Sequence, residues 1–227
     1  VLVLDEADRM LDVGFLPDLR RIVRLLPRER QTMLFSATLT PSIVSLSAEM
    51  TRNATRIQVE KKITPQAIAQ ALYPVAEHQK AQLLQTLLDD HDMKSVLVFT
   101  RTKHRADRIA KHLRGADIRA AVIHGNRTQP QRIAALESFR RGQSRVLVAT
   151  DIAARGIDVE GVSHVINYDM PMQREDYVHR IGRTGRAQAS GWAYTLVTPS
   201  DEGMVRQIES LLRQSIERRR PTGLTEQ

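Results

Sequence analysis

The sequence of 227 residues contains no cysteine, which excludes disulfides and thiolate zinc sites. Proteins of a reducing compartment commonly lack cysteine in this way, so we expect a cytoplasmic protein. No apolar run approaches the roughly 20 residues that a membrane-spanning helix needs, so we expect no membrane partner. Only 4% of the residues are aromatic, which argues against a nucleic-acid grip built mainly on stacked bases.

The sequence also has no Gly-Lys pair, so it lacks the phosphate-binding loop in which lysine follows the last glycine. This absence matters because residues 1–4 form an apolar run that stops at the carboxylates Asp5 and Glu6. Ligands of parallel sheets bind beyond the carboxyl ends of strands, where an acid pair suits a nucleotide-bound magnesium ion and a polarised water. We therefore expect the later part of a longer protein, inactive alone and dependent on a missing N-terminal half-domain.

Basic residues exceed acidic ones, and the formal net charge is +8. Only six of the 34 basic residues are lysines, and arginine matches phosphate oxygens with two parallel hydrogen bonds. This composition favours a polyanionic partner, most simply a nucleic acid. A genome rich in G and C produces the same excess of arginine, so the positions of the arginines have to decide.

Four apolar segments each break into a polar turn, and helical patterns separate them. The segments are residues 1–4, 32–35, 96–99 and 146–149, and the helical patterns are residues 16–26, 41–50, 77–88, 103–113 and 130–140. Further strands are expected at residues 56–59, 68–75, 119–123, 164–167 and 192–197, and a last helix near Ser200. This alternation predicts an α/β fold in which helices flank a parallel sheet.

A charged segment ending in proline, residues 61–66, is the expected linker between two domains. Residues 1–60 supply about three strands, too few to cover both faces of a parallel sheet. Residues 67–213 contain enough strands and helices for a complete domain. Residues 214–227 are expected to form a basic, flexible tail.

The most specific string is His-Arg-Ile-Gly-Arg-Thr-Gly-Arg at residues 179–186. Its glycines bring the backbone close to a ligand, and Arg183 and Arg186 extend from one turn. Such a pair suits a terminal phosphate, and arginine fingers are worth about 10³–10⁵ in rate in other phosphoryl-transfer enzymes. An isolated Arg-Gly-Arg would more simply be a basic loop.

This string is the last of four that occur in order along the chain. They are Asp5-Glu6-Ala7-Asp8, Ser36-Ala37-Thr38, Thr150-Asp151 with Arg155-Gly156-Ile157-Asp158, and residues 179–186. Together they resemble the motifs of the DEAD-box RNA helicases, and the segment His124-Gly125-Asn126 resembles the bacterial RhlE branch. The resemblance implies RecA-like domains, the end of a first one and a complete second one, that use ATP and Mg²⁺ to unwind short RNA duplexes.

For the first domain, the resemblance implies that Asp5 holds Mg²⁺ through water and that Glu6 orients and deprotonates the attacking water. It also implies that Asp8 links this motif to Ser36 and Thr38, which couple hydrolysis to strand separation.

For the second domain, the resemblance implies that Gly156 and Asp158 bind the nucleotide and that Arg183 and Arg186 are the arginine fingers. His179 would lie between the phosphate site and the switches of the first domain. The implied contacts to the RNA backbone come from Arg101, Thr102, Gly125, Gln129, Arg132, Thr150 and Arg155.

The residues themselves support part of this assignment. Arg101 and Thr150 lie at the carboxyl ends of two predicted strands, residues 96–99 and 146–149. Both therefore belong to the edge of the sheet where ligands bind. Simpler alternatives remain at three places: Asp151 and Arg155 could pair with each other, Ser36 and Thr38 could cap the following helix, and His124 could be a packed histidine. For the whole chain, the alternatives are a non-catalytic RNA-binding module and a DNA-directed superfamily 2 helicase.

Overall fold

The computed structural model describes residues 1–12, 14–58, 68–90, 92–154, 159, 161–185 and 191–220. The chain divides into two compact units, Val1–Lys62 and Ile63–Gln227. The expected linker, residues 61–66, lies outside the described residues, and the division of the chain between Lys62 and Ile63 falls within its range. Among the described helices, none has the length and apolar character that crossing a membrane requires.

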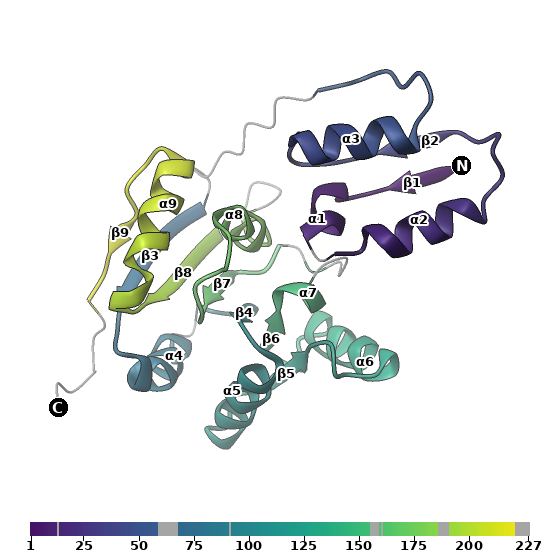
Figure 1. Cartoon of the computed structure of the whole chain (residues 1–227). Helices are drawn as coiled ribbons and strands as arrows, with labels where there is room; N and C mark the ends of the chain where they lie inside the picture. The colour runs from purple at the N-terminus through teal and green to yellow at the C-terminus, as the bar shows by residue number, and fades with distance from the viewer. Residues whose placement is uncertain are drawn as a thin grey trace. The chain divides into compact units, whose positions relative to one another are not determined.

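The described residues of the first unit form two parallel strands and three helices, which Figure 1 labels. In chain order they are β1 (Leu2–Leu4), α1 (Ala7–Asp12), α2 (Leu16–Arg24), β2 (Thr32–Leu34) and α3 (Pro41–Met50). Leu4, Leu19 and Ile43 are among the buried side chains that join the strands to the helices. The strand expected at residues 56–59 is not formed at residues 56–58, where Ile57 is 82% exposed and no described strand pairs with the backbone.

The second unit is built on a seven-stranded, all-parallel sheet in the order β5-β6-β4-β7-β8-β3-β9. The strands are β3 (Ile68–Pro74), β4 (Val96–Thr100), β5 (Ala120–Ile123), β6 (Val146–Thr150), β7 (His164–Asn167), β8 (Gly191–Val197) and β9 (Glu217–Arg218). The predicted α/β class with a parallel sheet is therefore confirmed.

Helices cover both faces of this sheet (Figure 1). They are the 3₁₀ turn η2 (Glu77–Gln79), α4 (Lys80–Leu88), α5 (Lys103–Gly115), α6 (Gln129–Arg140), α7 (Asp151–Ala154), α8 (Arg174–Ile181), the 3₁₀ turn η3 (Pro199–Asp201) and α9 (Glu202–Leu212). Side chains alternate along each strand. Val96 and Val98 therefore join the core under α4 and α5, while Leu97 and Phe99 join the core under α6 and α7.

Threonine side chains cap helix α5, which follows β4, and helix α6, which follows the edge strand β5. Thr102 accepts a hydrogen bond from the Arg105 backbone N–H at 3.2 Å and so caps α5. Thr128 and Gln131 form a reciprocal capping box at the start of α6. These caps fix where each turn at the end of a strand passes into its helix.

Part of the expected tail belongs to the sheet. β9 pairs with Ala71 and Leu72 of β3, and Ile216 is buried against the core under α9. The backbone N–H of Arg219 donates to the Leu72 carbonyl at 2.8 Å. This corrects the boundary expected after residue 213, because an apolar side chain and ladder hydrogen bonds hold the segment as far as Arg219. Residues 221–227 lie outside the described part of the chain.

Candidate functional site

In the first unit, the turn that carries Asp5 and Glu6 is held in an unusual conformation. Glu6 has a φ of 50°, in the left-handed region that a non-glycine residue rarely adopts. Such a residue costs on the order of 1–3 kcal/mol and persists only where its surroundings fix it. Here the next backbone N–H, that of Ala7, donates to the Phe35 carbonyl at 2.9 Å. The result is an exposed Asp5 and a half-buried Glu6 beyond the carboxyl end of β1.

Asp8 connects this turn to the loop after β2. Its Oδ2 accepts hydrogen bonds from the backbone N–H of Thr38 at 3.0 Å and from the Thr38 hydroxyl at 2.9 Å. The Ser36 hydroxyl donates to the Thr38 carbonyl at 2.7 Å. The residue that caps α3 is Thr40, so the helix-capping alternative for Ser36 and Thr38 is wrong. Hydrogen bonds therefore join the two loops directly.

The carboxylates of this turn suit a magnesium ion only when a nucleotide supplies further ligands. Among the described residues, no group of three or more histidines and carboxylates could hold a metal ion. Asp5 offers one exposed carboxylate, which fits Mg²⁺ because this ion keeps several waters and binds substrate phosphates.

In the second unit, the neighbouring strands β5, β6 and β4 bring predicted RNA-contacting residues to one edge of the sheet. β5, β6, β4 and β7 are adjacent in the sheet, and Thr100 and Thr150 are register partners at the ends of β4 and β6. Arg101 follows β4 directly, and Gly125 follows β5 after one residue. The shared edge expected from the sequence is therefore present.

Most groups on this edge are accessible to a ligand. Arg101, Thr102, Gly125 and Gln129 are exposed, whereas Thr150 is 9% exposed. Hydroxyls, guanidinium groups and glycine backbone suit phosphate oxygens, which position a nucleic acid without distinguishing its bases.

His124 stabilises the turn at Gly125. It is buried, and its Nδ1 accepts a hydrogen bond from the Asn126 backbone at 3.3 Å. Its Nε2 lies 3.1 Å from Asp107, whose carboxylate also accepts a hydrogen bond from Arg127 at 2.5 Å. Burial raises the pKa of Asp107, but His124 and Arg127 outweigh it and hold this pKa below its ordinary value. These contacts favour the interpretation of His124 as a packed histidine.

Arg180 is the central residue of this edge, and the sequence analysis missed it. Its side chain is 2% exposed and lies over the Phe99 ring, 5.0 Å from the centroid. Nε and Nη2 donate to the two carboxylate oxygens of Asp151 at 2.6 and 2.7 Å. Nη1 donates to the side chain of Asn167 at 3.1 Å and to the carbonyl of Asp169 at 2.7 Å. One guanidinium group thus ties α8 to the ends of β6 and β7.

The predicted arginine finger Arg183 lies in the turn directly after α8. Its backbone N–H donates to the Arg180 carbonyl, and its carbonyl accepts from Val162, both at 3.2 Å. The next residue, Thr184, donates from its hydroxyl to the carbonyl of Val162 at 2.5 Å. Arg183 and His179 are both half-buried. Hydrogen bonds to Arg180 and from Val162 thus fix the backbone of Arg183.

Several predicted site residues lie outside the described part of the chain. They are Arg155, Gly156, Asp158 and Arg186. The sequence suggested Arg155 as the partner of Asp151, but the partner that the structure describes is Arg180.

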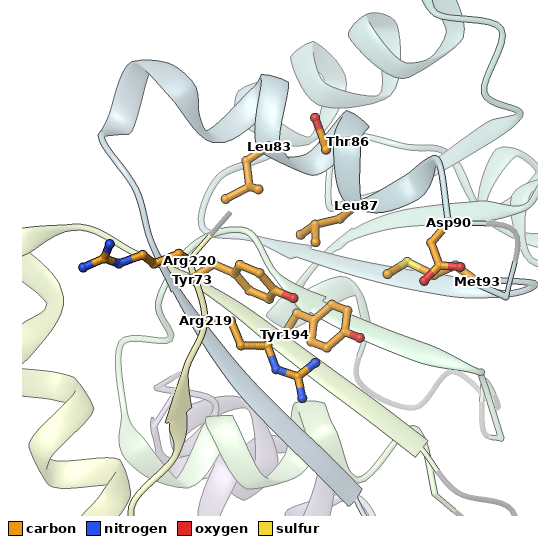
Figure 2. Close-up of a pocket in the computed structure, with 9 residues that line it drawn as sticks. All are labelled: Tyr73, Leu83, Thr86, Leu87, Asp90, Met93, Tyr194, Arg219 and Arg220. Carbon is orange, nitrogen blue, oxygen red and sulfur yellow. The ribbon is translucent and has the colours of Figure 1, made fainter. Parts of the chain in front are cut away.

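A separate pocket of about 390 Å³ lies between α4 and the sheet (Figure 2). Figure 2 shows Leu83 and Leu87 of α4 facing the rings of Tyr73 and Tyr194, with the guanidinium group of Arg219 beside Tyr194. The two tyrosine rings meet edge to face, with centroids 5.3 Å apart. None of the predicted site residues lines this pocket, so it is distinct from the strand-end edge.

Models of known protein families match a segment of each unit. Residues 1–46 match the DEAD/DEAH box helicase family, and residues 79–188 match the helicase conserved C-terminal domain. RhpA of Helicobacter pylori, a DEAD-box ATP-dependent RNA helicase, is 45% identical over 200 residues, which are 88% of this chain and 41% of RhpA. The chain spans about half the length of the curated relatives it matches.

Solved structures of similar proteins match most of the chain. Dbp5 of S. cerevisiae, bound to RNA and ADP BeF3, is 31% identical with a TM-score of 0.87, over 97% of this chain and 59% of Dbp5. The E. coli DEAD-box protein SrmB, bound to regulator of ribonuclease activity A, is 36% identical with a TM-score of 0.65, over 70% of this chain and 98% of the SrmB chain.

Proposed function

Because this chain belongs to the DEAD-box RNA helicase family, we propose that it acts in the ATP-dependent separation of short RNA duplexes. The RNA is bound through its backbone, without selection of a base sequence. The observation that carries this proposal is the common edge of β5, β6 and β4, where Gly125, Thr150 and Arg101 come together. The absence of cysteine supports a cytoplasmic place of action.

In this proposal the first unit contributes the hydrolytic carboxylates. Asp5 holds the nucleotide's Mg²⁺ through water, and the ion when bound neutralises charge on the phosphates. Glu6 orients the attacking water and accepts its proton. The contact between Asp8 and Thr38 supports a coupling role, because it joins the carboxylate turn to the loop after β2.

The second unit contributes the positive charge. Arg183 and Arg186 stabilise the charge that develops on the terminal phosphate, with Gly156 and Asp158 at the nucleotide and His179 beside the phosphate site. RNA phosphates are bound by Arg101, Thr102, Gly125, Gln129, Arg132, Thr150 and Arg155. Binding of ATP and binding of RNA favour each other, and loss of the terminal phosphate favours release of the RNA.

Binding of RNA by the 227-residue chain is the first test. Anisotropy of a fluorescent 15-nucleotide oligouridylate should report weak binding that falls linearly on a plot of log K against log salt, because phosphate contacts release counterions. Arg101→Ala should weaken binding and reduce the slope of this plot by about 1. Arg28→Ala, an exposed arginine of the first unit between α2 and β2, is the control and should leave both unchanged. Absence of RNA binding by the wild-type chain would refute the proposal.

ATP hydrolysis is the second test. These 227 residues contain no Gly-Lys loop to hold the phosphates, so we expect negligible RNA-stimulated ATPase activity from them alone. RNA-stimulated hydrolysis that Glu6→Gln abolishes would contradict this expectation.

The net charge of +8 and the exposed Arg101 also fit a second candidate, a non-catalytic RNA-binding module. This candidate predicts RNA binding that does not respond to ATP analogues, whereas the helicase proposal predicts tighter RNA binding with a nucleotide once a phosphate-binding loop is supplied on the same polypeptide. A competition between matched RNA and DNA strands separates both from a DNA-directed superfamily 2 helicase, which would bind DNA at least as well.

A further inference from the structure

We propose that Asp169 is a positioning residue that holds the RNA-contacting turn after β4 in register with helix α8. This inference rests on the proposed function, because it concerns how the same edge presents Arg101 to RNA. Asp169 belongs to none of the four motifs that carry the family resemblance, and it follows β7 by two residues.

The carboxylate of Asp169 holds the backbone at Arg101. Its Oδ2 accepts a hydrogen bond from the Arg101 N–H at 2.8 Å, and its Oδ1 pairs with the guanidinium group of Arg105. The side chain is 3% exposed, so water does not compete freely for these bonds. Arg101 cannot shift relative to β7 without breaking a partly buried, charge-assisted hydrogen bond.

The carboxylate is itself held in place from α5. Arg105 is on the first turn of α5, and the Nη1 atom that pairs with Asp169 also lies 2.9 Å from Glu77. Glu77 also pairs with the buried Lys80 at 3.3 Å. Two acidic and two basic groups thus alternate, which fixes the Asp169 carboxylate without leaving a charge unpaired.

The backbone of Asp169 is bound to α8. Its carbonyl accepts the 2.7 Å hydrogen bond from Arg180, whose other nitrogens bind Asp151. A single residue therefore contacts the turn that presents Arg101 through its side chain and the helix that leads to Arg183 through its main chain. Movement of α8 would reach the RNA edge through Asp169.

The test compares three substitutions of Asp169 by RNA affinity, with the oligouridylate as probe. Asn keeps an acceptor at the correct distance for the Arg101 N–H, so Asp169→Asn should stay within about twofold of wild type, well under the 1.4 kcal/mol of a tenfold change. Asp169→Ala removes the acceptor, and Asp169→Glu moves it by one methylene. Both should bind RNA about tenfold more weakly, which corresponds to the loss of one buried hydrogen bond.

Amide exchange gives a readout that does not depend on RNA. The Arg101 N–H should be protected in wild type and in Asp169→Asn, and should exchange faster in Asp169→Ala and Asp169→Glu. Asp201→Ala is the matched control, because Asp201 also accepts a backbone hydrogen bond, from Thr198 at 2.9 Å, but follows β8 rather than β7. It should leave RNA affinity and Arg101 exchange unchanged.

The outcomes are distinguishable. Unchanged RNA affinity and unchanged Arg101 exchange in a folded Asp169→Glu or Asp169→Ala protein would overturn the role of Asp169. The proposed function would not be affected by this result. The reverse order, with Glu like wild type and Asn weak, would also overturn it, since charge pairing with Arg105 would then be what matters. A wild-type chain that fails to bind RNA would overturn the proposed function as well.

Discussion

Arg180 and Asp151 form a bidentate ion pair at the end of β6, with nitrogen to oxygen distances of 2.6 and 2.7 Å. The arginine is almost fully buried and the aspartate partly so. The cost of removing these charges from water is offset because each nitrogen of the guanidinium group donates to an acceptor. The pair therefore joins two segments that are 29 residues apart in the sequence.

Removal of this guanidinium group should destabilise the second unit strongly. Arg180→Met should lower the free energy of unfolding by about 3–5 kcal/mol, because it leaves the Asp151 carboxylate without its partner. Arg141→Met is the control, since Arg141 and Glu137 form an exposed pair that should be worth about 0–1 kcal/mol. Urea unfolding of the two variants measures the difference, and equal losses would contradict the assigned role of Arg180.

A side chain at Gly191 should disrupt the turn after Arg183. An alanine Cβ at this position would lie 2.3 Å from the Gly185 nitrogen and 2.4 Å from the Thr184 hydroxyl. Gly191→Ala should therefore cost about 3 kcal/mol of stability. Gly203→Ala is the matched control, because nothing lies within 4 Å of its Cβ, and it should stabilise α9 by about 0.5–1 kcal/mol. Similar thermal unfolding of the two variants would refute the steric argument.

Loss of the Asp8 carboxylate should loosen the loop after β2. Asp8→Ala leaves the Thr38 N–H and hydroxyl without their acceptor, at a cost of about 1–3 kcal/mol. Asp8→Asn keeps one acceptor oxygen and should lose less. Hydrogen exchange at the Thr38 amide measures the effect directly, and an unchanged exchange rate in Asp8→Ala would contradict it.

The stability of the second unit should fall as the solution is acidified through the range where histidine titrates. Burial lowers the pKa of His164 below its ordinary value of 6.5, and Arg145 adds to this effect while Asp90 and Asp92 oppose it. The unfolded chain then binds the proton at a higher pH than the folded chain does. Unfolding free energy should therefore rise with pH between about pH 5 and 7, where the unfolded state holds more protons.

His164→Phe tests this dependence. The phenyl ring preserves the stacking on Trp192, whose ring centroid lies 6.5 Å from that of His164. The variant should show a flatter dependence of unfolding free energy on pH than wild type. The same slope in both proteins would assign the dependence to other groups.

The sequence predicted the strands that are buried on both faces, because these are unbroken apolar runs. β4 and β6 were found in this way, and their polar ends correctly placed Arg101 and Thr150 on one edge. Helix α3 was predicted with its observed bounds, since Pro41 marks its first turn. The two-residue β9 is too short to carry any pattern.

Helix α8 escaped prediction for a different reason. Its buried positions are Tyr177, Arg180 and Ile181, which have helical spacing. The middle one is an arginine, so hydrophobic periodicity does not register it. The available signal was the helical spacing of Arg180 from Tyr177, together with the aspartate Asp151 at the end of a buried strand, where a carboxylate needs a cationic partner. A buried arginine of this kind can be predicted from the sequence only when its acidic partner in another segment is known.

The short outermost strand β9 has a consequence for self-association. Its two residues, Glu217 and Arg218, are followed by Arg219 and Arg220, so the sheet ends in a brief, charged border. Neighbouring molecules extend each other's sheets most readily where a border is long, flat and uncharged. We conclude that this border discourages fibril-like stacking of one molecule on the next.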